Sequence, residues 1–110
     1  MAGLSRVTPA TLDVLEVLLD DEVEPYGLAI AKKAGLATGS VFPILARLER
    51  LGWVASDWED TDRPGARRRL YRFTPDGMAG ARVLLAERRG RDAGRRRGLG
   101  GFTPAPEGPR

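Results

Sequence analysis

Residues 38–53, TGSVFPILARLERLGW, constrain the fold most strongly, because they combine helical periodicity with an internal proline. Val41, Leu45 and Leu48 recur at i, i+4 and i+7, the spacing of side chains on one face of an α-helix. Small and basic residues fill most of the other positions. Gly52 follows, as glycine often does where a helix ends. The segment therefore predicts an amphipathic helix with one apolar face and one polar, basic face.

Pro43 restricts where this helix can begin. Proline has no backbone N–H, so a helix accepts it without cost only in the first turn, where N–H groups have no intrahelical partner. Ser40 is therefore the preferred N-cap, with Pro43 as the third helical residue, and Thr38 is the second candidate. Free backbone N–H groups beside hydroxyl side chains would make this helix start suited to phosphate.

The rest of the chain carries further helix and strand signals. Thr8-Pro9 and Thr74-Pro75 each place a hydroxyl cap before a proline, which indicates a helix start. Gly35 fits the left-handed residue that ends a helix. Strand-like segments on both sides of Pro64-Gly65 indicate a hairpin with a long charged tip. The predicted elements are helices over residues 8–20, 26–34, 40–51 and 75–89 and strands over residues 53–59 and 67–73.

Charge is divided unevenly along the 110 residues. Residues 1–62 hold 5 basic and 11 acidic residues, a net charge of −6, whereas residues 63–110 hold 13 arginines and 4 acids, a net charge of +9. A basic half on a small chain favours a polyanionic partner, with nucleic acid first. We therefore expect double-stranded DNA as the partner, with a solvated charged surface as the alternative.

The chain contains no cysteine and no histidine. Disulfides, Cys/His metal sites, thiol nucleophiles and imidazole bases are therefore excluded. The acids at residues 20–22 and 59–62 lie in predicted linkers, so we expect no enzyme activity, no metal and no cofactor. The N-terminus lacks the apolar core of a signal peptide, and no apolar run approaches the roughly 18 residues that span a bilayer. A cytoplasmic protein without a membrane partner is expected.

A chain of this length forms one small domain and little more. We expect a flexible segment at residues 1–7, a folded domain with dimerisation helices at residues 8–90, and a disordered Gly/Pro/Arg tail at residues 91–110, which has almost no apolar content. The first helix is apolar nearly all round, so either a partner chain or the last helix covers its second side. The candidates for a homodimer interface are Leu12, Val14, Leu15, Leu18, Met78, Ala81, Leu84 and Leu85.

The predicted order is helix, helix, helix, hairpin, helix, with a tight turn at residues 35–37. The fold class is therefore mainly α with a small β-hairpin, a winged helix-turn-helix with three helices, a two-stranded wing and a C-terminal helix. In this geometry the third helix lies in the major groove of DNA and the hairpin reaches the backbone or minor groove beside it. The basic face of the third helix and the wing arginines would then meet one duplex.

Four segments resemble the PadR family of bacterial transcriptional regulators: YGLAIAKKAGL, GSVFPILARLERLGWV, SDWED and RPGARRRLYRFTPDGMA. The resemblance covers roughly residues 12–85, and its wing-to-helix run is the most distinctive part. It implies a homodimer that represses promoters by binding near-palindromic operators. It places DNA contacts at the start of the third helix, at a basic position further along it, and on the wing. The DNA-binding candidates are Thr38, Ser40, Val41, Phe42, Pro43, Arg47, Arg63, Arg67 and Arg68.

The chain departs from the family pattern in three places. Phe42 stands where tyrosine is usual, which replaces a phosphate hydrogen bond by an apolar contact, for example to a thymine methyl. Leu70 stands where the wing often has the first of two adjacent tyrosines. The last helix is expected to be short and without aromatics, unlike the long helices through which some members dimerise and bind flat aromatic ligands. No small-molecule effector is therefore assigned.

Several assignments have alternatives. Phe42 could pack into the first turn of its helix, and Arg47 could pair with Glu49 or another acid. Trp53 and Trp58 are expected to pack between the hairpin and the helices. For function, the alternative is a winged-helix architectural or protein-docking factor without a dedicated operator. A near-palindromic footprint on DNA would distinguish a repressor from such a factor.

Overall fold

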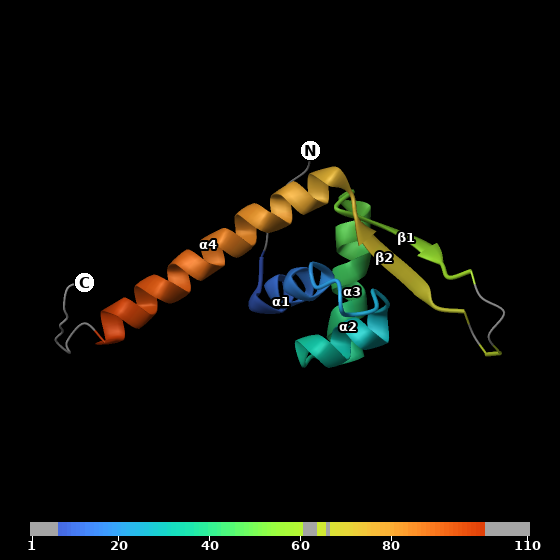
Figure 1. Ribbon diagram of the computed structural model, residues 1–110, viewed down its shortest axis with the longest axis horizontal. Helices are drawn as coiled ribbons and strands as arrows, with labels where there is room; N and C mark the ends of the chain where they lie inside the picture. The colour runs from blue at the N-terminus through green and yellow to red at the C-terminus, as the bar shows by residue number, and fades with distance from the viewer. Residues whose placement is uncertain (1–6, 61–63, 66, 101–110) are drawn as a thin grey trace.

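The computed structural model describes residues 7–60, 64–65 and 67–100, the last six of them by backbone alone. Its elements are helices α1 (Pro9–Leu18), α2 (Gly27–Ala34) and α3 (Thr38–Arg50), strands β1 (Val54–Trp58) and β2 (Arg69–Phe73), and helix α4 (Pro75–Gly100). The first three helices gather into a body, the hairpin projects from one side, and α4 runs past α1 and out on the other side (Figure 1). This arrangement confirms the predicted winged helix-turn-helix.

Three of the local signals in the sequence are confirmed. The Thr8 side chain caps α1 by accepting a hydrogen bond from the N–H of Thr11 (3.1 Å). The Thr74 hydroxyl caps α4 by accepting from the N–H of Gly77 (3.0 Å). Gly35 ends α2 with a φ of 72°, in the left-handed region that favours glycine.

The predicted hydroxyl cap of α3, Ser40 or Thr38, is wrong. Ala37 is the cap residue, and the N–H of Ser40 donates to its carbonyl (2.9 Å). Only residues 36–37 separate α3 from the glycine that ends α2, so the helix must begin at once. Pro43 is therefore the sixth helical residue instead of the third, and the carbonyl four residues before it has no N–H to accept from. Burial of the apolar face of α3 compensates for this lost bond.

The core joins all four helices to the hairpin. Leu15, Ile30, Leu45, Leu48 and Leu85 are at most 2 % exposed. They come from α1, α2, α3 and α4, so the first helix is covered from inside the chain. No single described helix is long and apolar enough to cross a bilayer; α2 and α3 satisfy that test only together, as a pair bent by 117°.

Most of the predicted dimer interface is part of this core. The five candidates that are 0–5 % exposed are Leu12, Val14, Leu15, Ala81 and Leu85. Side chains that the chain itself buries cannot also contact a partner, so these five are wrong as direct dimer contacts. Burial beneath α4 explains the apolar surplus of α1. Leu18, Met78 and Leu84 are partly exposed and remain candidates.

Trp53 confirms its predicted packing role. It is 3 % exposed and lies against α4 at Gly77 and Gly80, where an added Cβ would overlap its backbone and its ring, respectively. Trp58, at the far end of β1, is 56 % exposed, so the packing prediction is wrong for this residue. The difference follows from position, because β1 leaves the helical body as it runs toward the hairpin tip (Figure 1).

The last helix is much longer than predicted. It continues beyond Arg89 to Gly100, so the expectation of a short last helix and of disorder from residue 91 is wrong for residues 91–100, while residues 101–110 lie outside the described part. Glycine in a helix costs about 1 kcal/mol relative to alanine, but arginine and alanine are good helix formers and outnumber it here. Arg88 also ties α4 to α1 through Asp13 (2.8 Å) and Glu16 (3.2 Å).

The hairpin is attached to the segment that leads into α2. β1 and β2 pair antiparallel, with Ser56 opposite Tyr71. The N–H of Tyr71 donates to the Pro25 carbonyl (2.8 Å), and Tyr26 forms a bridge with Leu70. These backbone bonds hold the start of α2 against the wing, so α2, α3 and the hairpin together border the surface described next.

Candidate nucleic-acid interface

A groove of about 560 Å³ lies between the start of α2, the first half of α3 and the hairpin. Its walls combine aromatic side chains with three consecutive arginines. The lining residues are Tyr26, Gly27, Leu28, Phe42, Trp58, Arg67, Arg68, Arg69 and Tyr71. The helix expected in the major groove and the arginine-bearing wing therefore border the same surface feature.

Phe42 connects α3 to α2 at the floor of this groove. Its ring lies against Gly27, where an added Cβ would overlap the ring, so a side chain at that position would displace it. Phe42 is nevertheless 44 % exposed. One side of the ring therefore packs inside the chain, while the rest faces the groove.

Arg67 and Arg68 line the groove, and each is oriented by neighbouring groups. The Nε of Arg67 donates to the Glu59 carbonyl (3.0 Å). The guanidinium of Arg68 lies 4.3 Å from the centroid of the Tyr26 ring, and its Nη1 lies 3.4 Å from Glu24. Such stacking on an aromatic face restrains a long side chain while its charge stays near the surface.

The remaining DNA-contact candidates on α3 differ in their exposure. Thr38, Ser40 and Pro43 are exposed, whereas Val41 is fully buried on the apolar face, so its assignment as a direct DNA contact is wrong. Arg47 is half-buried and interacts within the chain. The exposed polar residues of α3 therefore lie at its start, at Thr38 and Ser40, and at its end, at Arg50.

Arg63 lies outside the described residues. Sequence reasoning grouped Arg69 with Arg67 and Arg68 as wing arginines that contact DNA, but it missed Tyr26, Leu28 and Trp58 as groove residues. The two-residue period of the strands could have placed Trp58 and Arg69 on one face of the hairpin. No such signal identifies Leu28, which is 61 % exposed because of how α2 is set against the wing.

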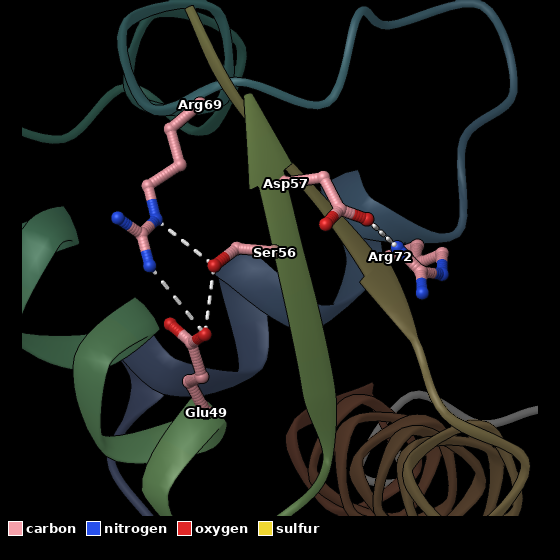
Figure 2. A network of polar contacts seen from close by, with 5 residues as sticks. All are labelled: Glu49, Ser56, Asp57, Arg69 and Arg72. Carbon is pink, nitrogen blue, oxygen red and sulfur yellow. Dashed lines mark hydrogen bonds and ion pairs between the residues drawn. The ribbon is translucent and has the colours of Figure 1, made fainter. Parts of the chain in front are cut away.

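A polar network joins α3 to both strands of the wing (Figure 2). The Ser56 hydroxyl donates to Oε2 of Glu49 (2.7 Å) and accepts from Nε of Arg69 (2.9 Å). Nη2 of Arg69 lies 3.7 Å from the same carboxylate oxygen, and its guanidinium lies 5.5 Å from the centroid of the Trp58 ring. Glu49 and Arg69 are partly exposed, so a charged groove residue is paired with an acid of α3.

A second ion pair lies on the opposite face of the hairpin (Figure 2). Nη1 of Arg72 lies 2.7 Å from Oδ2 of Asp57, and both side chains are about two-thirds exposed, at 66 % and 71 %. On the face that carries Ser56 and Arg69, burial raises the pKa of the Tyr71 phenol; Arg69 opposes this effect and Glu49 adds to it. Among the described residues, no group of three or more acids is placed to hold a metal ion.

Comparison with known proteins agrees with this geometry. Residues 14–83 match the model of the Transcriptional regulator PadR-like family. A comparison with curated proteins gives no significant match. Many solved structures share the fold, and three of the most similar are described next.

A PadR family transcription regulator from hypervirulent Clostridium difficile R20291 is 26% identical, with a TM-score of 0.65, over 81% of this chain and 98% of that chain. The protein smu.1704 from Streptococcus mutans UA159 is 18% identical, with a TM-score of 0.71, over 94% and 100%. The PcaV transcriptional regulator from Streptomyces coelicolor is 22% identical, with a TM-score of 0.66, over 92% and 66%. At these lower identities the last two comparisons show the fold alone.

The family model covers more than half of the chain, from the middle of α1 into α4. It therefore includes α2, α3 and the wing, which border the groove. The chain belongs to the PadR-like family of transcriptional regulators, and its activity is DNA binding.

Proposed function

We propose that this regulator is a repressor that binds a near-palindromic operator as a homodimer. The observation that carries the proposal is the groove bordered by both α3 and the wing, because a single duplex can meet both elements there. Thr38, Ser40 and Pro43 face the bases of the major groove, and Phe42 supplies an apolar contact such as one to a thymine methyl. As a regulator of bacterial promoters, the protein acts in the cytoplasm.

Phosphate contacts supply most of the affinity in this proposal. Arg67 and Arg68 lie on the wing side of the groove, where phosphate groups of a duplex seated on α3 would pass. If each subunit neutralises three or four phosphates, the dimer neutralises about seven, and log K falls with log salt concentration with a slope on the order of −6. A slope near zero would contradict a binding mode dominated by these arginines.

The dimer is proposed to form through α4 and the end of α1. Leu18, Met78 and Leu84 are partly exposed there, and Val83 on α4 is 58 % exposed. In a dimer that binds successive major grooves, the two α3 helices lie about 34 Å apart. Light scattering at micromolar concentration tests the assembly, and a monomeric protein would refute this part of the proposal.

Selection of binding sites from a random duplex pool, followed by footprinting, tests the operator. We expect a protected near-palindrome. Arg68→Gln should weaken binding to selected and random DNA by the same factor, because phosphate contacts carry no sequence information. Ser40→Ala should change which sequences are selected. Arg72→Gln is the matched control, since Arg72 lies on the hairpin face away from the groove and its loss should change binding little.

The same experiment distinguishes the alternative function. A winged-helix architectural or docking factor would bind random DNA about as well as any selected sequence and would leave no defined footprint. That result would refute the repressor proposal while leaving DNA binding intact.

A further inference from the structure

Arg69 occupies an unusual position among the three consecutive arginines of the wing. It lines the groove together with Arg67 and Arg68, so a phosphate bound there would lie within its reach. Unlike them, Arg69 is held by a residue of α3 itself, because Glu49 accepts a hydrogen bond from the Ser56 hydroxyl and forms an ion pair with the Arg69 guanidinium (Figure 2). One acid of the DNA-contacting helix thus competes with DNA for one arginine of the wing.

Ser56 fixes the positions of Glu49 and Arg69 relative to each other. Its hydroxyl donates to Glu49 and accepts from Arg69, so both of its hydrogen-bonding functions are used. The short 2.7 Å bond to the carboxylate is of the charge-assisted kind, which is stronger than a bond between neutral groups. The three residues come from α3, β1 and β2, so the network also fixes the angle of the wing relative to α3.

We propose that Glu49 is a positioning residue, which holds the wing against α3 through Ser56 and keeps Arg69 from binding phosphate. This inference rests on the proposed function and concerns the same surface. In it, DNA of any sequence gains the phosphate contacts of Arg67 and Arg68 but not that of Arg69. Because phosphate contacts carry no sequence information, the acid lowers the affinity for selected and random DNA by the same factor.

The test is Glu49→Gln, measured by titration with a 30-base-pair duplex of random sequence at several salt concentrations. Glutamine keeps the shape of the side chain and can still accept from Ser56, while the attraction for Arg69 is lost. Each released arginine should strengthen random-DNA binding about fivefold at 0.15 M salt and steepen the salt slope by about 0.9. The affinity for a duplex obtained by selection should rise by the same factor, since phosphate contacts carry no sequence information.

Asp57→Asn is the matched control, because it removes the same charge from the residue of β1 that follows Ser56. It releases Arg72, which does not line the groove and lies on the hairpin face opposite Arg69 (Figure 2). A simple effect of net charge, or of hairpin stability, would change both variants alike. Thermal unfolding of each variant identifies any loss of stability separately from the change in DNA binding.

A double-mutant cycle with Arg69→Gln completes the experiment. Arg69→Gln should change random-DNA binding little in the wild-type background and should cancel the gain in the Glu49→Gln background. Equal effects of Glu49→Gln and Asp57→Asn would overturn the inference. So would an equal loss from Arg69→Gln in both backgrounds, since Arg69 would then already bind phosphate. If the wild-type protein binds no DNA at all, the proposed function fails and this inference with it.

Discussion

Gly77 offers a sharp test of how α4 docks on the body. It lies in the first turn of α4, and an added Cβ would overlap the backbone carbonyl group of Trp53. That carbonyl accepts hydrogen bonds from the N–H (3.0 Å) and the hydroxyl (3.2 Å) of Thr74, the residue that caps α4. A backbone group held in this way cannot move aside as a flexible side chain would, so Gly77→Ala must shift the helix.

Opposing effects set the magnitude of this change. Alanine is favoured over glycine in a helix by about 1 kcal/mol. Overpacking against a fixed neighbour costs typically 1–3 kcal/mol, and each weakened hydrogen bond of Thr74 costs about 1 kcal/mol more. We therefore expect Gly77→Ala to lower the free energy of unfolding by about 1–3 kcal/mol. The melting temperature should fall by roughly 4–8 °C for each kcal/mol.

Gly90→Ala provides the matched control in the same helix. An added Cβ at Gly90 meets no atom within 4 Å, so only the helix preference of alanine acts there. Urea and thermal unfolding, followed by far-ultraviolet circular dichroism, should show Gly77→Ala below wild type and Gly90→Ala at or up to about 1 kcal/mol above it. A Gly77→Ala protein as stable as wild type would refute the close docking of α4 on Trp53.

Three further changes have defined outcomes. Arg88→Gln removes both ion pairs between α4 and α1. In urea unfolding it should lower the free energy of unfolding by about 1 kcal/mol at low salt and by less at 1 M salt. The same loss at both salt concentrations would mean that packing, not charge, dominates. Pro43→Ala restores an N–H for the Gly39 carbonyl and should stabilise the fold by about 2 kcal/mol, whereas a destabilised variant would show that the ring is needed for packing. Above pH 10.0 the unfolded chain loses the Tyr71 proton, whereas the folded state, with its raised pKa, keeps it. The free energy of unfolding should therefore fall as the pH rises toward the raised pKa. In alkaline urea unfolding, Tyr71→Phe should remove that part of the fall.

Local chemistry made much of this fold predictable from the sequence. Thr8 and Thr74 act as caps because a hydroxyl before a proline satisfies helix-end N–H groups without help from the rest of the chain. Gly35 ends α2 for a similar reason, since only its own backbone conformation matters. The buried face of α3, with Val41, Leu45 and Leu48, follows from helical periodicity alone.

The features that sequence reasoning missed depend on distant residues. The start of α3 at Thr38 is set by the short connection from α2, which outweighs the cost of Pro43. The extension of α4 is supported by Arg88 and two acids of α1 more than 70 residues earlier. The groove likewise depends on α2 meeting the wing, and no local pattern around Leu28 or Trp58 indicates that contact.

The structure also shows that the acidic and basic parts of the chain neutralise each other in part. The acidic and basic halves suggested a surplus of positive charge free for a polyanion. In the structure, the ion pairs described above each join an acid of residues 1–62 to an arginine of residues 63–110. Arg68 is paired with Glu24 and Arg69 with Glu49, so phosphate must displace a carboxylate before it gains either arginine in full. Such an exchange releases fewer counterions than binding to a free arginine, so the salt dependence of DNA binding should be weaker than the number of wing arginines alone would indicate.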